Sequence, residues 1–198
     1  MQPVVLPPGS DAIAAWARGH RLPYQPAPEP SWYRAWEPFD TIVAPGRYYN
    51  AVEIAVAGGR AIVVEPWASL DDTPPLDRTI VAFVTHPELH HRASAKVGDT
   101  FLTRVAYVGQ TPPRQQTTGD VEWDHVAVTY AATPLEAVRA ITPSLRKLLL
   151  GWGFAGHLEI REGAMLFHLA DARPTPADYD RVARWIPAVI EKARKTRG

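Results

Sequence analysis

Proline is the most unusual feature of this chain, because it occupies 20 of the 198 positions. That is about twice the usual share of this residue. Eight of the prolines lie in three stretches, at residues 22–30, 71–77 and 110–120. A proline ring fixes φ and lowers the entropy of the unfolded chain, so we expect these stretches to be rigid connections between elements. A proline-rich ligand for an SH3-like partner is the alternative interpretation.

The hydrophobic pattern between the prolines predicts a mixed α+β fold. Gly58 and Gly59 are expected to form the two-residue turn of a first hairpin, and Glu162 and Gly163 the turn of a second. Several hairpin-connected strands precede the later helices, which predicts a mainly antiparallel sheet covered on one face by helices. The predicted helices are residues 10–20, 133–153 (interrupted at Pro143) and 175–196, the hairpins 48–67 and 157–170, and the further strands 78–85, 100–108 and 121–130.

The last predicted helix is amphipathic. Pro187 would clash with the carbonyl of Ala183, so a kink or a break is expected there. The apolar residues that share one face of this helix are Tyr179, Val182, Ile186, Val189, Ile190 and Ala193.

Length and composition favour one domain over residues 1–198, with a proline-rich N-terminal segment at 20–46 and a possible strand–helix–hairpin–helix subdomain at 121–196. The chain has no cysteine, which excludes disulfides, cysteine-ligated zinc and thiol catalysis. The 21 basic residues balance the 21 acidic ones, which argues against a nucleic-acid partner. The sequence contains no apolar run long enough to span a bilayer and no secretory signal, so we expect a soluble, cytoplasmic protein.

Residues 85–92, THPELHHR, raise the question of a metal site. His86 and His90 would share one side of a helix, and zinc could bind them together with His91 or a carboxylate. Further candidate ligands on predicted strands are Asp124, His125, His157 and His168.

Helix capping is the competing interpretation of the same stretch. Thr85 and Glu88 fit the Thr-x-x-Glu capping box, which satisfies two backbone N–H groups at a helix start. The box recurs at residues 133–136 and, with aspartate, at 175–178. We therefore expect a capped helix start at residue 85 and predict no cofactor, with zinc as the alternative.

Motifs for other catalytic classes are missing from the sequence. No serine lies in a Gly-x-Ser-x-Gly elbow, and the glycine-rich stretch at 57–61 has neither a dinucleotide-binding nor a P-loop pattern. Asp124 and His125 are neighbours in a predicted strand, so they would point to opposite faces.

Aromatic residues crowd the first third of the chain. Tyrosine and tryptophan combine an apolar body with a polar group, which suits binding surfaces as well as packing onto a sheet. We take them as the candidate binding surface: Trp32, Tyr33, Trp36, Phe39, Tyr48, Tyr49 and Trp67.

The C-terminal half resembles a family of uncharacterised bacterial α+β domains. The resemblance rests on VEWDHVAVTYAATPLEAVRAITPSLRKLLLGW, on LEIREGAMLFHLA and on a closing helix. Residues 141–145, Ile-Thr-Pro-Ser-Leu, match the helix start of that family, and the earlier hairpin at 50–67 is similar to its preceding strand pair. The resemblance implies a fold and carries no activity to this chain.

These observations together favour a non-catalytic binding domain whose partner is another protein or a second copy of the chain. Two other functions stay open. One is a metal-dependent hydrolase that uses His86, His90 or His91, and the other is a small-molecule pocket between the sheet and the helices.

Overall fold

The computed structural model describes residues 5–29, 46–67, 77–98 and 113–194. The helices are α1 Ser10–Gly19, α2 Val121–Val126, α3 Pro134–Ala140, α4 Pro143–Gly151 and α5 Pro176–Ala193. The strands are β1 Tyr24–Gln25, β2 Arg47–Val56, β3 Gly59–Trp67, β4 Val81–Thr85, β5 Ala93–Val97, β6 Arg114–Gln116, β7 Ala127–Ala131, β8 Gly156–Arg161 and β9 Ala164–Leu169.

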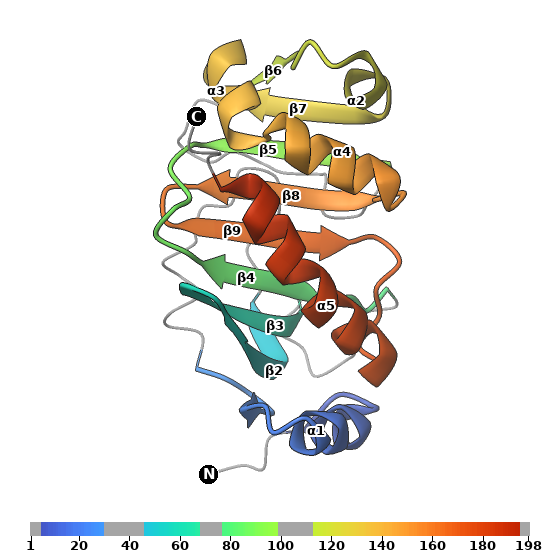
Figure 1. Cartoon of the computed structure of the whole chain (residues 1–198). Coiled ribbons are helices and arrows are strands. Elements are labelled where there is room, and N and C mark those ends of the chain that lie inside the picture. Colours follow the sequence, from blue (N-terminus) through green and yellow to red (C-terminus); the bar gives the residue numbers. More distant parts are fainter. Residues whose placement is uncertain (1–4, 30–45, 68–76, 99–112, 195–198) are drawn as a thin grey trace.

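The described strands form one sheet in the order β1-β2-β3-β4-β9-β8-β5-β7-β6, and every pairing in it is antiparallel. Helices α3, α4 and α5 lie against one face, and α1 lies at the β1–β2 end (Figure 1). The predicted α+β class, with a mainly antiparallel sheet and a C-terminal helix, is confirmed. The hairpin β8–β9 lies in the middle of the sheet, between β4 and β5.

The main core lies between the sheet and the helices. Because side chains alternate along a strand, Ala82 and Val84 of β4 enter this core, whereas Val81 and Phe83 join a smaller apolar cluster on the opposite face. We call that opposite face, turned away from the helices, the far face.

Helix α5 packs as its periodicity predicts. All six residues of the predicted face are buried in the main core. The predicted break does not occur, because the helix continues through Pro187, whose side chain is exposed. The hydrogen bond that proline cannot donate is therefore lost without ending the element.

Both hairpins are confirmed, with one change of turn. The first turns at Ala57 and Gly58, where glycine has φ +79°, and Gly59 already begins β3. A side chain at residue 59 would lie 2.3 Å from the carbonyl oxygen of Thr85, so the close approach of β4 requires glycine there. The second hairpin turns at Glu162 and Gly163 as expected.

Two strand predictions need correction. The strand expected at 121–130 is divided, since α2 occupies Val121–Val126 and β7 begins at Ala127. Asp120 caps α2 by accepting the N–H of Trp123, and that cap outweighs the strand propensity of the local sequence. The strand expected at 78–85 begins only at Val81, and the one expected at 100–108 lies outside the described residues.

The helix expected from residue 85 does not form. Thr85 ends β4, where it pairs with Arg60 and Ala164, so its backbone is committed to the sheet. Residues 87 and 88 form a turn, the rest of 86–92 has no regular secondary structure, and Glu88 makes an ion pair with Arg194 after the end of α5. The other two boxes do cap helices, because Thr133 caps α3 and Thr175 caps α5.

Candidate functional site

Polar side chains lie buried in the middle of the far face. His168 of β9 lies opposite His157 of β8, which in turn lies opposite Lys96 of β5. One step along the strands, Glu159 lies opposite Ser94. We call these five residues the polar patch. Their neighbours along each strand, such as Leu158 and Phe167, enter the main core instead.

The two histidines of the polar patch are almost fully enclosed, with exposed fractions of 0% for His157 and 1% for His168. Burial, with smaller contributions from His168 and Lys96, lowers the pKa of His157 to about 3. Burial likewise lowers the pKa of His168 to about 3, with Arg173 adding to the effect and Asp171 opposing it. Both rings are therefore neutral at pH 7.

Thr79 fixes the orientation of the His168 ring. Its hydroxyl donates to the carbonyl oxygen of Ala172 at 3.1 Å and lies 2.9 Å from Nε2 of His168. Since the hydroxyl proton is used by Ala172, Nε2 carries the ring proton and donates to Thr79.

Glu159 is a buried carboxylate with a charged partner. It is 1% exposed, and Nη2 of Arg161 donates to its Oε1 at 2.6 Å. Ser94, on the next strand, is also 1% exposed, and its hydroxyl makes no hydrogen bond with the described residues. The polar patch thus combines the neutral His157, His168 and Ser94 with two charged side chains, Lys96 and Glu159, and Arg161 makes an ion pair with Glu159.

A second buried carboxylate, Glu65, lies on β3 on the helix side of the sheet. It accepts hydrogen bonds from Asn50 at 2.9 Å and Trp67 at 2.8 Å, and from Nε and Nη2 of Arg78 at 2.6 and 3.0 Å. Asn50, with φ +53°, lies where the β2–β3 register shifts, and Tyr179 of α5 donates to its carbonyl oxygen at 2.7 Å. Glu65 therefore holds the irregular strand through Asn50, and Asn50 in turn accepts from α5, which gives Glu65 a structural role.

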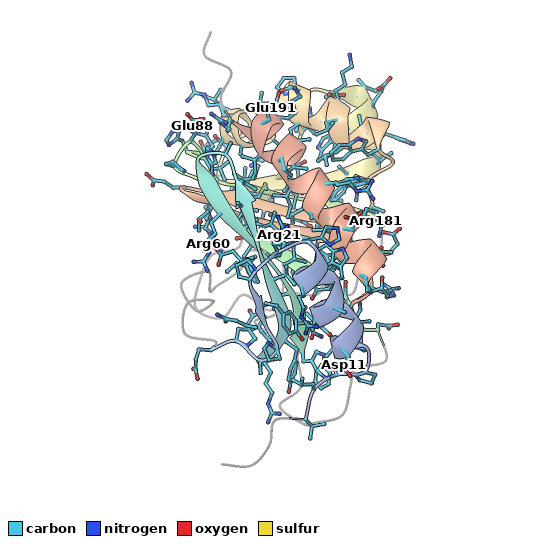
Figure 2. All side chains as sticks on the ribbon, turned by 60° about the horizontal axis from the view of Figure 1, so that its bottom comes forward. Asp11, Arg21, Arg60, Glu88, Arg181 and Glu191 are labelled. Atoms are coloured by element: carbon cyan, nitrogen blue, oxygen red, sulfur yellow. The ribbon has the colours of Figure 1, made fainter. Side chains whose placement is uncertain are left out.

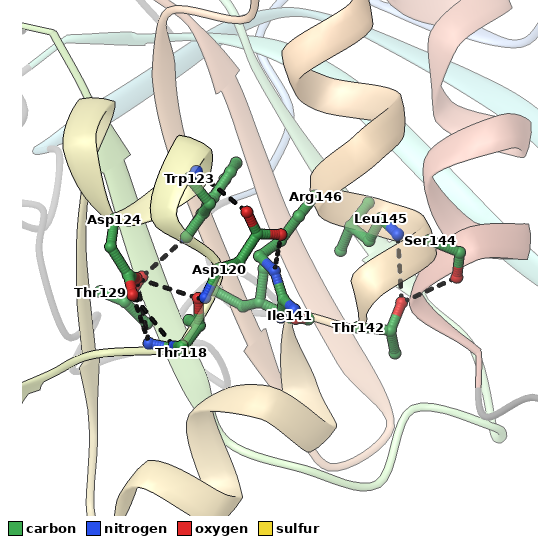
Figure 3. A network of polar contacts seen from close by, with 11 residues as sticks. Thr118, Asp120, Trp123, Asp124, Thr129, Ile141, Thr142, Ser144, Leu145 and Arg146 are labelled. Carbon is green, nitrogen blue, oxygen red and sulfur yellow. Dashed lines mark hydrogen bonds and ion pairs between the residues drawn. The ribbon is translucent and has the colours of Figure 1, made fainter.

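A third network ties α2 to α4 (Figure 3). Arg146 is 4% exposed, and it donates to Asp120 at 2.9 Å and to the carbonyl oxygen of Ile141 at 2.6 Å. The hydrogen bond from Arg146, together with the N–H of Trp123, lowers the pKa of Asp120 below its usual value. Thr118 and Gly119 donate to Asp124, which folds the chain back onto α2.

The three histidines of residues 86–91 do not converge. His86 is 2% exposed; its Nδ1 accepts the N–H of Glu88 at 3.2 Å, so its Nε2 donates to the carbonyl oxygen of Ala57 at 3.0 Å. His90 is exposed, and Nδ1 of His91 lies 3.5 Å from Glu136. Within the described ranges, no three His, Asp or Glu side chains are placed to hold a metal ion. Zinc binding by His86, His90 and His91 stays a prediction.

The other candidate ligands are dispersed in the same way. Asp124 and His125 lie on α2 and not on a strand, so the expectation that they point to opposite faces of a sheet does not apply. Asp124 is engaged by Thr118, and His125 is exposed. His157 and His168 are the pair that the fold brings together.

Three of the seven aromatic candidates are described, and all three lie in the interior. The exposed fractions of Tyr48, Tyr49 and Trp67 are 4%, 3% and 2%. The Tyr49 and Trp67 rings pack with their centroids 4.6 Å apart, and Tyr48 meets Phe83 edge-on at 6.0 Å. Trp32, Tyr33, Trp36 and Phe39 lie outside the described residues, so the binding surface stays a prediction for them.

An open groove of about 470 Å³ lies at the β1–β3 end of the far face. Ala51 and Ile62 belong to the far-face apolar cluster and line its floor, and the ion pair of Glu53 and Arg60 (2.6 Å) lies beside them. Figure 2 shows Arg60 on the β2–β3 hairpin, away from Arg181 of α5. The residues of the proline-rich segment that line the groove are Pro23, Gln25, Pro26, Ala27, Pro28 and Glu29.

The groove is distinct from the pocket predicted between sheet and helices, which stays a prediction.

The sequence analysis does not predict the polar patch as one unit. Its signal was available in the alternation of His157, Glu159 and Arg161 with apolar residues, which is the pattern of a strand with one polar face. The pairing of His157 with His168 follows from the hairpin turn at residues 162–163.

Comparisons with known proteins give one structural likeness. No family model matches the sequence, and neither does any curated protein. The fold is similar to the crystal structure of the mycobacterial trehalose monomycolate transport factor A, TtfA, with a TM-score of 0.57 and 12% sequence identity. The match covers 96% of this chain and 98% of that chain. At this identity the likeness concerns the fold alone. Within the described residues, no helix is long and apolar enough to cross a membrane.

Proposed function

We propose that this protein is a non-catalytic binding domain whose partner is another protein. The contact surface in this proposal is the proline- and aromatic-rich N-terminal third, from the groove at residues 23–29 to the aromatic residues that follow it. The observation that carries the proposal is the groove, because it is an exposed concave surface whose lining segment directly precedes, in the sequence, the stretch with the highest density of aromatic residues.

The buried polar networks support a structural interpretation of the interior. Glu65 accepts four hydrogen bonds, and Arg146 is held by Asp120 and Ile141. Groups committed in this way stabilise the fold, since each would be costly to leave without its partner. They are poorly placed to exchange protons with a substrate.

The similarity of fold to TtfA supports the proposal that this chain has an accessory role. The two chains match over nearly their full lengths, so the same architecture serves as a transport factor in that protein. Because one fold supports many functions, we extend the analogy to an accessory role and no further.

The proposal is tested by replacing aromatic residues of the predicted surface. We expect the double variant Trp32→Ala/Trp36→Ala to lose partner capture by about tenfold or more in a pull-down with tagged protein, with an unchanged melting temperature. The matched control is Trp152→Ala, which removes a partly buried tryptophan that packs on Trp185 of α5 on the helix side of the sheet, and which should leave capture intact. A large fall in the melting temperature of the double variant with intact capture would instead make Trp32 and Trp36 core residues.

A further inference from the structure

The walls of the groove are held in place before any partner arrives. Pro23, Pro26 and Pro28 have fixed φ angles, so little conformational entropy remains to be lost there on binding. The segment is also attached to the sheet, because the N–H groups of Asn50 and Glu53 donate to the carbonyl oxygens of Pro26 and Pro23 at 2.9 and 3.0 Å. The groove is thus a preorganised feature of the sheet end.

The shape of the groove suits an extended chain better than a small molecule. Small-molecule sites usually enclose about 70–90% of the ligand surface. Here Pro23, Gln25, Pro26 and Ala27 are exposed, so a ligand would keep one side in water. An extended peptide tolerates this arrangement, since it places alternate side chains into the groove and the others outward.

The charges of the groove define the partner further. Arg60 supplies one positive charge and is already bonded to Glu53 at 2.6 Å. Glu29 supplies a second carboxylate and is exposed at the end of the segment. Among the described lining residues, two carboxylates and one guanidinium give one net negative charge, beside the apolar floor of Ala51 and Ile62.

We propose that the groove binds an extended peptide segment of a partner protein, one that presents a lysine or arginine to Glu29 and Glu53 and a small aliphatic side chain to Ala51 and Ile62. This inference rests on the proposed function and names the chemistry of its partner. The positive charge of the ligand completes the charge balance of the groove, and its aliphatic side chain covers the apolar floor.

The probes for this proposal are two blocked pentapeptides, one of alternating valine and lysine and the other of alternating valine and glutamate. Each is titrated into the whole ¹⁵N-labelled protein, and amide shifts are followed by NMR. We expect the lysine peptide to shift the amides of Gln25, Ala27, Glu29, Ala51 and Glu53. The glutamate peptide should leave them unchanged at the same concentration, because it has the same β-forming valines and the opposite charge.

The decisive variant is Glu29→Lys, which reverses an exposed charge and should leave the fold intact. We expect it to weaken binding of the lysine peptide by about fivefold or more. The matched control is Glu162→Lys, which makes the same change in the exposed β8–β9 turn and should bind as the unmodified protein does. Equal shifts from both peptides, shifts outside the groove, or binding that Glu29→Lys does not weaken would overturn the proposal.

The failure of this inference can be separated from failure of the proposed function. If Trp32→Ala/Trp36→Ala abolishes partner capture while Glu29→Lys does not, the binding function stands and the groove is not its site. If Glu29→Lys weakens both peptide binding and partner capture, the groove is confirmed as part of the contact surface.

Discussion

Two regions of this sheet bury ionisable groups by opposite means. At the β2–β3 end, Glu65 is surrounded by four hydrogen-bond donations, two of them from the guanidinium of Arg78. In the polar patch, His157 and His168 are buried just as deeply, and burial lowers the pKa of both rings until they are neutral. A buried group can therefore keep its charge with a complete set of partners or give the charge up. The first solution is sensitive to the loss of a partner, and the second to pH.

Acidification should produce the largest effect. With pKa values of about 3 when folded and 6.5 when unfolded, each histidine binds fewer protons in the folded protein within that window. The free energy of unfolding therefore falls as the pH drops below 6.5, by about 1.4 kcal/mol per pH unit for each ring, or roughly 5 kcal/mol for both at pH 4.5. Above pH 6.5 this contribution is fully present, and near pH 3 it is fully lost.

Denaturant unfolding between pH 4 and 7.5 measures this slope. The variants His157→Gln and His168→Gln, which do not titrate in this range, should each reduce it by about one proton. An unchanged slope in both variants would mean that these rings do not carry the pH dependence.

Removing Glu65 should produce the largest effect of a single substitution at neutral pH. Glu65→Ala leaves the donors of Arg78, Asn50 and Trp67 buried without their acceptor, and we expect a loss of about 3–5 kcal/mol in the free energy of unfolding. The control is Glu53→Ala on the neighbouring strand. Its partner Arg60 is exposed, so the loss there should stay within about 0–1 kcal/mol.

A double variant sharpens the same point. Glu65→Leu/Arg78→Leu removes the charge together with its principal partner, and it should be more stable than Glu65→Ala. Unfolding in guanidinium chloride at pH 7 measures these free energies. Equal losses for Glu65→Ala and Glu53→Ala would contradict this account.

The smallest expected effect concerns the neutral hydrogen bond in the polar patch. Thr79→Val keeps the shape of the side chain but removes the acceptor for Nε2–H of His168, at a cost of about 1–2 kcal/mol. The ¹⁵N shifts of the His168 ring report which nitrogen is protonated, and we expect Nε2 in the unmodified protein. A ring protonated on Nδ1 would contradict the hydrogen-bond assignment through Thr79 and Ala172.

Local patterns predicted much of the fold. The two hairpins, the interruption before Pro143 and the buried face of α5 each depend on residues close together in sequence. The same local logic was wrong at Thr85, because the pairing of that residue with β3 and β9 decides its conformation. It was also wrong at residues 121–126, where the cap from Asp120 prevails over a strand-like composition.

The candidate site was predicted less well, since it depends on which strands become neighbours. His157 and His168 were named as separate candidates, but Lys96 and Ser94 of β5 join them only because β8 lies beside β5 in the sheet. No local signal contains that neighbour relation. The groove arises in the same way, from the proline segment meeting the far face of β2 and β3.

The central place of the β8–β9 hairpin has a consequence for how the chain is completed. Strands β4 and β5 follow each other closely in sequence, yet the two strands that join them end only at Leu169. During synthesis, the edges of β4 and β5 that will pair with β9 and β8 stay unpaired while more than 60 further residues are added after β5. Exposed strand edges pair readily with other chains, so the protein is most prone to aggregation late in its own synthesis.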